Sequence, residues 1–231
     1  MDAGGNTIGP YHQSPASVPI DLSMPSLELE ESICAEIGSG LIAGLDEAGR
    51  GAIAGPVVAA AVILPLDQPE KLEQLSEVDD SKKLSPKVRD RLYDLVVDLA
   101  LAYGVGASSA GEIDRYGIMG ATRLAMRRAS SQLSPQPTYL LIDGRIRLRD
   151  PALPQQSIIR GDGKSLTIAA ASILAKVTRD KTMIDRQGEY PVYGFARHKG
   201  YCTPFHVRAL DKHGPCPIHR RTFAPIRQTL V

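Results

Sequence analysis

Two short apolar runs early in the chain limit the folds that it can adopt. Residues 41–45 (LIAGL) and 54–64 (AGPVVAAAVIL) are almost wholly aliphatic, and Gly49 and Gly51 lie between them. Runs of this length and composition predict buried strands, close enough together to form a hairpin. Three further apolar runs predict additional strands, at residues 101–107, 139–142 and 157–159. The sequence therefore predicts a sheet of five strands.

Segments whose apolar residues have helical spacing lie between the later strands. Ser85 and Pro86 have the N-cap and first-turn chemistry that begins a helix, and apolar side chains follow at steps of three and four. Three more helices are predicted, at residues 120–133 and 166–186 and near 204–213. Because strands come first and then alternate with helices, the sequence predicts an α/β fold with a mixed sheet flanked by helices. The first strands should pair antiparallel and the later ones parallel, and residues from about 189 to 231 should form a small helical extension.

The first 38 residues differ in composition from the rest of the chain. They hold six acidic residues and no Lys or Arg, and they are rich in Gly, Ser and Pro. A segment without a sustained apolar period cannot bury enough surface to fold by itself. We therefore expect residues 1–38 to be a disordered acidic tail and residues 39–231 to be one folded domain.

Several classes of protein do not fit this sequence. No run reaches the roughly 18 apolar residues that span a bilayer, which excludes a membrane-spanning protein. The three cysteines form no CxxC pair and no even framework, which favours a reducing compartment. The N-terminus has neither the basic nor the apolar region of a secretory signal, and the first Lys or Arg is Arg50. We expect a cytoplasmic protein that forms a monomer and does not bind a membrane.

Charge is distributed unevenly along a chain whose formal net charge is only +1. Residues 195–231 hold seven Lys or Arg against one acid, Asp211, together with four of the five histidines. A basic end indicates an anionic partner such as a nucleic acid, although most such clusters are simply solvated.

Acidic residues stand at the ends of predicted buried strands. Asp46 and Glu47 end the first strand, Asp143 ends the fourth, and Asp162 follows the fifth. Carboxylates that meet at one edge of a sheet repel each other unless a cation lies between them, and Mg²⁺ or Mn²⁺ takes such oxygen ligands. Two such ions can stabilise both the attacking and the leaving oxygen of a phosphodiester. Since neighbouring strand residues point to opposite faces, Asp46 and Glu47 can serve one site only if the strand ends or bulges there.

Each of these residues also has an ordinary interpretation. A strand-end Asp is common as a helix cap or turn residue, and Asp143-Gly144 is a usual turn dipeptide. Gly49-Arg50-Gly51 would let a backbone approach a phosphate closely, and Lys82 and Lys83 could contact one, but solvated loops would look the same.

The chain resembles bacterial ribonuclease HII, of the type 2 ribonuclease H family. The blocks that carry the resemblance follow the family order over residues 41–225: 44–51 (GLDEAGRG), 54–61 (AGPVVAAA), 80–85 (DSKKLS), 142–144 (IDG), 161–165 (GDGKS), 168–180 (IAAASILAKVTRD), 198–201 (HKGY) and 219–225 (HRRTFAP). Small departures are Ala52-Ile53 after the Gly-Arg-Gly, Arg160 in place of Lys, and Cys202 after the tyrosine. None of them removes a carboxylate or the tyrosine.

The resemblance implies a ribonuclease H-like fold, in which residues 39–231 are the catalytic domain, and a metal-dependent endoribonuclease activity. It implies that Asp46, Glu47, Asp143 and Asp162 are catalytic and bind Mg²⁺ or Mn²⁺, with two ions when substrate is bound. It also implies that the enzyme cleaves the RNA strand of RNA–DNA hybrids and cuts on the 5′ side of single ribonucleotides in duplex DNA. The products would carry 3′-hydroxyl and 5′-phosphate ends.

Substrate contacts are implied in the same way. In this family the Gly-Arg-Gly backbone and a tyrosine read the ribonucleotide 2′-hydroxyl, which assigns that role to Gly49, Arg50, Gly51 and Tyr201. Lys82 and Lys83 are expected to contact the substrate as well. An aromatic ring suits such a reader because it stacks on a sugar or base without regard to sequence.

Other interpretations remain at this point. Asp180 also lies in a family block, but its spacing from Lys176 predicts an ion pair along one helix face. Five Cys and His residues near the C-terminus could suggest zinc, yet they lack a CxxC pair: Cys202, His206, His213, Cys216 and His219. A hybrid-binding protein without turnover would also have this fold, although the intact carboxylates favour an enzyme. The sister family, ribonuclease HIII, has an extra N-terminal domain that a 38-residue tail cannot supply.

Overall fold

A five-stranded sheet forms the centre of the protein, which is described by a computed structural model over residues 24–149 and 153–228. The strands are β1 (Ile42–Ala48), β2 (Val57–Ile63), β3 (Ala102–Ser108), β4 (Tyr139–Asp143) and β5 (Gln155–Ile158). Their order in the sheet is β3-β2-β1-β4-β5. β1, β2 and β3 pair antiparallel, whereas β4 pairs parallel with both β1 and β5. The predicted mixed sheet is therefore confirmed.

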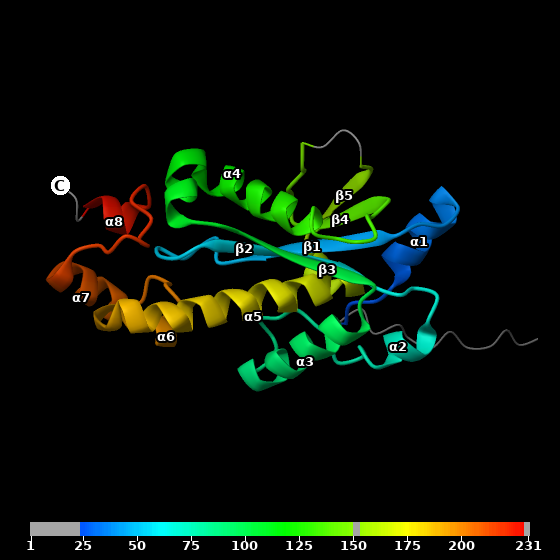
Figure 1. The fold of residues 1–231 in the computed structure, drawn as a ribbon, viewed down its shortest axis with the longest axis horizontal. Coiled ribbons are helices and arrows are strands. Elements are labelled where there is room, and N and C mark those ends of the chain that lie inside the picture. Colours follow the sequence, from blue (N-terminus) through cyan, green and yellow to red (C-terminus); the bar gives the residue numbers. More distant parts are fainter. Residues whose placement is uncertain (1–23, 150–152, 229–231) are drawn as a thin grey trace, which may run out of the picture.

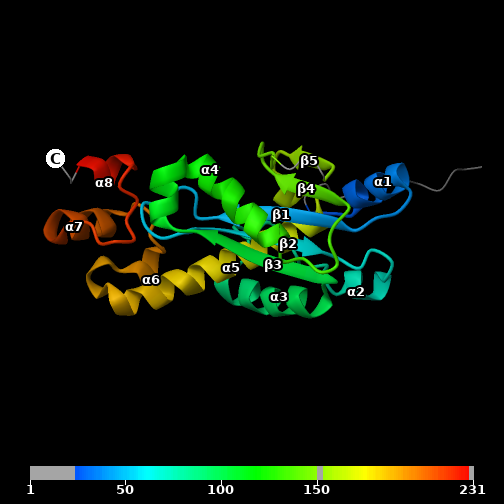
Figure 2. The ribbon, with the colours of Figure 1, turned by 45° about the horizontal axis from the view of Figure 1, so that its top comes forward.

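Helices cover both faces of this sheet. The longer ones are α1 (Glu28–Ile37), α3 (Pro86–Leu99), α4 (Ala110–Ser130), α5 (Leu166–Glu189) and α7 (Pro204–His213). Short helices are α2 (Pro69–Glu73), α6 (Phe195–His198) and α8 (Ala224–Gln228), with single 3₁₀ turns at Gly161–Gly163 and Pro191–Tyr193. Figure 1 shows α4 on one face of the sheet and α3 and α5 on the other. Figure 2 shows α6, α7 and α8 at the end of the molecule opposite α1, as the predicted C-terminal extension requires.

Close packing of α5 on β1 places the functional part of that helix. A Cβ atom at Gly44 would lie 2.2 Å from the backbone carbon of Thr167, so only glycine lets the helix approach this closely. The next turns of α5 present small side chains, among them Ala169, Ala170 and Ala171, all fully buried. Because both contact surfaces are small, α5 runs directly beneath β1 towards the strand's C-terminal end.

The helix α4 begins ten residues before the predicted start. Ser109 and Glu112 form a reciprocal capping box there, and Ser109 accepts a hydrogen bond from the Glu112 amide at 3.2 Å. Gly117 interrupts the helix with φ of 69°. The regular spacing of apolar residues is broken there, so periodicity does not predict the turns before it. In the described part of the chain, no helix has the length and apolar character needed to cross a membrane.

The expectation of a disordered tail is wrong for residues 24–38, whereas residues 1–23 lie outside the described ranges. Residues 28–37 form α1, and Ile33 is buried against Ile42 of β1, Leu141 and Ile168. The periodicity argument missed this helix because an acidic side chain, Glu30, occupies a buried position on its inner face.

Glu30 ties α1 to the beginning of α5. Its Oε1 atom accepts hydrogen bonds from Ser165 Oγ at 2.6 Å, from the Thr167 amide at 3.0 Å and from Thr167 Oγ1 at 2.7 Å. The carboxylate therefore meets the free amides at the N-terminus of α5, where the helix dipole favours negative charge. Ser26 adds two backbone bonds to the same segment, with Lys164 and Leu166.

Replacing Glu30 with Ala is expected to lower the free energy of unfolding by about 2–3 kcal/mol, because three buried donors lose their acceptor. Glu30→Gln keeps one acceptor oxygen and should cost less. Urea unfolding measures both. The control is Glu31→Ala, on the exposed side of the same helix, for which a change within about 0.5 kcal/mol is expected. Equal stability of Glu30→Ala and the native chain would contradict a structural role for α1.

Candidate active site

Two of the predicted catalytic acids are neighbours on an uninterrupted strand. Asp46 pairs with Ala60 and Glu47 with Ala59 in the regular β1–β2 register. The expected bulge is therefore wrong, and the strand ends at Ala48, one residue after Glu47. The parallel pairing of β1 with β4 stops one residue earlier, at Leu45 and Ile142. Beyond that point β1 lacks a neighbour on the β4 side, so side chains from both of its faces can reach the space next to Asp143.

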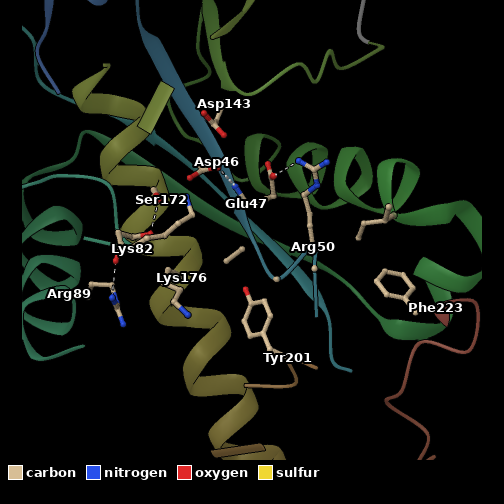
Figure 3. Close-up of a pocket in the computed structure, with 15 residues that line it drawn as sticks. Asp46, Glu47, Arg50, Lys82, Arg89, Asp143, Ser172, Lys176, Tyr201 and Phe223 are labelled. Carbon is tan, nitrogen blue, oxygen red and sulfur yellow. Dashed lines mark hydrogen bonds and ion pairs between the residues drawn. The ribbon is translucent and has the colours of Figure 1, made fainter. Parts of the chain in front are cut away.

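Figure 3 shows this arrangement, with Asp46 and Glu47 on opposite sides of β1 and Asp143 beside them. The three carboxylates line one cavity of about 820 Å³. Its wall also includes five of the six predicted substrate-binding residues: Gly49, Arg50, Gly51, Lys82 and Tyr201. The structure thus brings together residues that lie up to 155 positions apart in the chain.

Asp162, the fourth predicted acid, lies in an adjoining hollow of about 770 Å³. Asp143 and Lys82 line both spaces and so connect them. Lys82 Nζ donates to Asp162 Oδ2 at 2.9 Å. Lys83 lines the second hollow, where its ammonium group contacts Asp79 at 2.9 Å. The predicted residues therefore divide into two connected groups along one surface.

Crowding of negative charge raises the pKa values of the central carboxyls. Burial raises the pKa of Asp46 well above its usual 3.8, and the charges of Glu47 and Asp143 raise it further. Burial also raises the pKa of Glu47, although Arg50 partly offsets this effect. The pKa of Asp143 is raised by burial and by Asp162. Each of these carboxylates is thus destabilised as long as no cation lies between them.

The donor set fits a hard divalent cation. Glu47 Oε2 is buried and has no hydrogen-bond partner, and the surrounding ligand atoms are carboxylate oxygens, which Mg²⁺ and Mn²⁺ prefer. Within residues 24–149 and 153–228, however, no three His, Cys, Asp or Glu side chains are grouped so that they could hold a metal ion as they stand. Two of the acids are engaged by basic side chains instead: Glu47 contacts Arg50 at 2.9 Å, and Asp162 contacts Lys82 at 2.9 Å.

Lys82 and Arg50 act as internal counter-cations for these acids. Burial alone would lower the pKa of Lys82, but its hydrogen bond and ion pair with Asp162 raise it above the usual value. The Lys82 side chain is 73% exposed and that of Arg50 42%, so both can move away from their partners. Exposed ion pairs of this kind contribute little to stability. Both side chains can therefore change partners at little cost in stability.

Sequence reasoning missed several residues that complete the site. Ser172 of α5 lines the cavity beside Asp46 and partly offsets the rise in the pKa of that carboxyl, and its hydroxyl lies 2.9 Å from that of Ser81. Arg89 donates to the carbonyls of Ser81 and Leu84, which fixes the loop that carries Lys82. Spacing along the chain could not reveal these contacts, because each joins segments whose proximity depends on the fold.

The remaining candidates have structural partners. Lys176 Nζ contacts Asp180 at 2.8 Å, which confirms the predicted i,i+4 ion pair. His206 and His219 face each other with their Nε2 atoms 2.9 Å apart, and the His219 Nδ1 atom accepts from the Cys216 amide at 2.9 Å. Burial lowers the pKa of both imidazoles to about 4, so both are neutral near pH 7. His206 Nδ1 is 2.9 Å from the Tyr201 carbonyl, so this pair supports the backbone of Tyr201.

Comparisons with known proteins agree with this arrangement. The family model for Ribonuclease HII matches residues 43–226. Ribonuclease HII of Geotalea daltonii is 52% identical over 191 residues, which are 83% of this chain and 86% of that protein. Ribonuclease HII of Chloroflexus aggregans is 52% identical over 206 residues, which are 89% of this chain and 96% of that protein.

Among solved structures, ribonuclease H2 from Pyrococcus horikoshii OT3 has a TM-score of 0.70 and 27% identity, covering 81% of this chain and 96% of that one. The chain belongs to the ribonuclease HII family, whose members are metal-dependent endoribonucleases.

Proposed function

We propose that this enzyme cleaves the RNA strand of RNA–DNA hybrids and also cuts on the 5′ side of a single ribonucleotide in duplex DNA. The observation that carries the proposal is the grouping of Asp46, Glu47 and Asp143 around one cavity, next to the backbone of residues 49–51. A phosphodiester bound there would meet carboxylates for metal ions, basic side chains for its charge and an exposed aromatic ring.

The four carboxylates are proposed to hold divalent ions, Mg²⁺ or Mn²⁺, with two ions present when substrate is bound. Asp46 and Asp143 would contribute oxygens from the centre of the site, Glu47 its unpartnered Oε2 atom, and Asp162 an oxygen from the adjoining hollow. When bound, such ions activate a water nucleophile and stabilise the departing oxygen. The products would then carry 3′-hydroxyl and 5′-phosphate ends.

The side chains around the carboxylates have separate proposed roles. Arg50 and Lys82 would leave Glu47 and Asp162 and bind phosphate oxygens, which frees both acids to serve as ligands. The backbone of residues 49–51 would approach the 2′-hydroxyl, because a Cβ at Gly51 would meet nothing within 4 Å and the cavity is open there. Tyr201, which is 39% exposed, would stack on the sugar or base. Lys83 and Lys82 would contact the strand beyond the scissile phosphate.

We also expect this enzyme to be a monomer and to act in the cytoplasm.

The test is a cleavage assay on a duplex DNA that contains one ribonucleotide. The full chain should cut it once, on the 5′ side of the ribonucleotide, with Mg²⁺ or Mn²⁺ and not with EDTA. End labelling should identify a 3′-hydroxyl and a 5′-phosphate. In the absence of nucleic acid, Mn²⁺ should raise the melting temperature, because binding to the folded state relieves carboxylate repulsion. Binding of the duplex without cleavage under any divalent ion would favour the alternative, a hybrid-binding protein without turnover.

A further inference from the structure

Two guanidinium groups lie buried behind the proposed substrate-reading elements. Arg179 on α5 and Arg220 before α8 are both 0% exposed. Neither forms an ion pair with a carboxylate in the described ranges, and their donors go to backbone carbonyls instead. Burying a charge without a counter-charge costs several kcal/mol, and an apolar side chain of similar volume would be less costly. Two such residues side by side therefore call for a specific explanation.

Arg220 holds the loop that contains the Gly-Arg-Gly sequence. We refer to residues 49–56 as the reading loop. The Arg220 Nη2 atom donates to the Gly49 carbonyl at 2.8 Å and to the Pro56 carbonyl at 3.1 Å. Its Nη1 atom donates to the Arg50 carbonyl at 2.9 Å, and its Nε atom to the Gly55 carbonyl at 3.0 Å. The planar guanidinium group of Arg220 thus holds both ends of the reading loop.

Arg179 joins the reading loop to Tyr201. Its Nε and Nη2 atoms donate to the carbonyls of Pro56 and Ala54, at 3.0 and 3.2 Å. Its Nη1 atom donates to the carbonyl of Lys199 at 2.9 Å. The guanidinium carbon also lies 5.4 Å from the centre of the Tyr201 ring, at a cation–π distance. This side chain therefore contacts both of the elements proposed to read the ribonucleotide, which are about 150 residues apart in the chain.

Local sequence supports this arrangement on both sides. A Cβ at Gly49 would lie 1.8 Å from Arg179 Nε, so the first glycine of the reading loop leaves the space that the guanidinium fills. The Ile53 amide donates to the Gly200 carbonyl at 2.9 Å, directly before Tyr201. The two charges also affect each other: burial and the neighbouring Arg179 lower the pKa of Arg220 to about 9. The fold therefore keeps two guanidinium groups that repel each other. What they contribute at these positions is their directional hydrogen bonds to backbone carbonyls.

We propose that Arg179 and Arg220 are positioning residues that hold the reading loop and the Tyr201 ring at a fixed separation, and that they thereby set the preference for a single ribonucleotide in DNA. The inference rests on the proposed function. At a single ribonucleotide only one 2′-hydroxyl is present, so the reading loop and the Tyr201 ring must both be correctly placed around that one nucleotide. In a continuous RNA strand a displaced loop can still meet one of many 2′-hydroxyls.

The test compares Arg220→Lys and Arg179→Lys with the native enzyme. A lysine keeps the charge but cannot donate to three or four carbonyls in the geometry of the fork. We measure kcat/KM on two substrates: a DNA duplex with one ribonucleotide and a hybrid with a continuous RNA strand. The ratio of kcat/KM on the single-ribonucleotide duplex to kcat/KM on the hybrid should fall about 10- to 100-fold. A loss of this size is expected when the reading loop or the Tyr201 ring is displaced by about 1 Å. The Mn²⁺-dependent rise in melting temperature should remain, because the carboxylates are not altered.

A stability control separates positioning from folding. Leu92→Ala, in the core cluster to which α3, α5 and β2 contribute, should lower the melting temperature without changing the substrate ratio. In a double-mutant cycle, Arg179→Lys should cost little further selectivity once Tyr201 is replaced with Ala. Arg179→Lys also keeps the test decisive if Arg220→Lys does not fold.

Three outcomes would overturn the inference. They are a substrate ratio within about twofold of the native value in both variants, a fall in the ratio of the same size in Leu92→Ala, and additive effects in the cycle. Failure of the proposed function gives a different result, because the native enzyme would then leave the single-ribonucleotide duplex intact.

Discussion

Replacing Asp46 with Asn is expected to lower kcat by about 1000-fold or more while raising the free energy of unfolding. The amide has nearly the same size, and its oxygen can still accept the hydrogen bond that Asp46 Oδ1 receives from the Glu47 amide at 2.7 Å. The substitution removes a buried charge that Glu47 and Asp143 repel. Activity should therefore be lost although the fold becomes more stable. Asp143→Asn should change both quantities in the same directions, because burial and Asp162 raise its pKa.

The stability gain should depend on pH in a defined direction. Folding raises the pKa of Asp46 above 3.8, so the folded chain binds more protons than the unfolded one at pH values above that point. The cost of the ionised carboxylate is thus absent in acid and grows as the pH rises. Urea unfolding of Asp46→Asn and the native chain should give similar stabilities near pH 4 and diverge towards pH 8. A variant that is less stable at every pH would contradict the repulsion on which the metal assignment depends.

A control on α4 should behave in the opposite way. Glu112 pairs with Arg128 at 2.7 Å, and this contact, with the hydrogen bond from the Ser109 amide, lowers its pKa to about 2. Glu112→Gln should therefore reduce stability and leave kcat within about twofold of the native value. If Glu112→Gln lost activity as severely as Asp46→Asn, the loss in Asp46→Asn could not be assigned to the site.

The sequence located β2 well because every residue of this strand is apolar. β2 is buried at all seven positions, so an aliphatic run identified it directly. The argument failed where a polar side chain has a distant partner. Glu30 looks like a solvated acid in the sequence, and only the fold shows that the N-terminus of α5 receives it. The first turns of α4 were missed for a different reason, since Gly117 breaks the helical period within a continuous element.

The residues of the site also fall into those that the sequence could predict and those that it could not. Asp46, Glu47 and Asp143 could be proposed from their places at strand ends, because strand topology brings those ends together. The expected bulge was wrong because a strand without a neighbour on one side exposes both faces at its edge. Arg179 and Arg220 could not be identified, since a basic residue in a sequence indicates solvent or phosphate, and here each is enclosed by carbonyl groups. Contacts of this kind depend on the assembled backbone.

Replacing Tyr201 with Ala is expected to lower kcat/KM for a single ribonucleotide in duplex DNA by about 10- to 100-fold, the loss of one aromatic stacking contact. The ring is 39% exposed in the cavity, and the Arg179 guanidinium lies 5.4 Å from its centre. Its backbone would remain in place, because the carbonyl contacts His206 and the neighbouring Gly200 binds Ile53. Stability should therefore change little, and the effect should appear in cleavage kinetics.

Tyr201→Phe is the matched control for this experiment, because it keeps the ring and removes only the hydroxyl. If stacking is what the ring contributes, Phe should retain most of the native kcat/KM, whereas Leu, which is apolar but not aromatic, should resemble Ala. A loss in Phe as large as that in Ala would instead assign the role to the hydroxyl group. Native rates in Tyr201→Ala would remove the ring from the set of substrate contacts, and the remaining selectivity would then depend on the backbone of residues 49–51 alone.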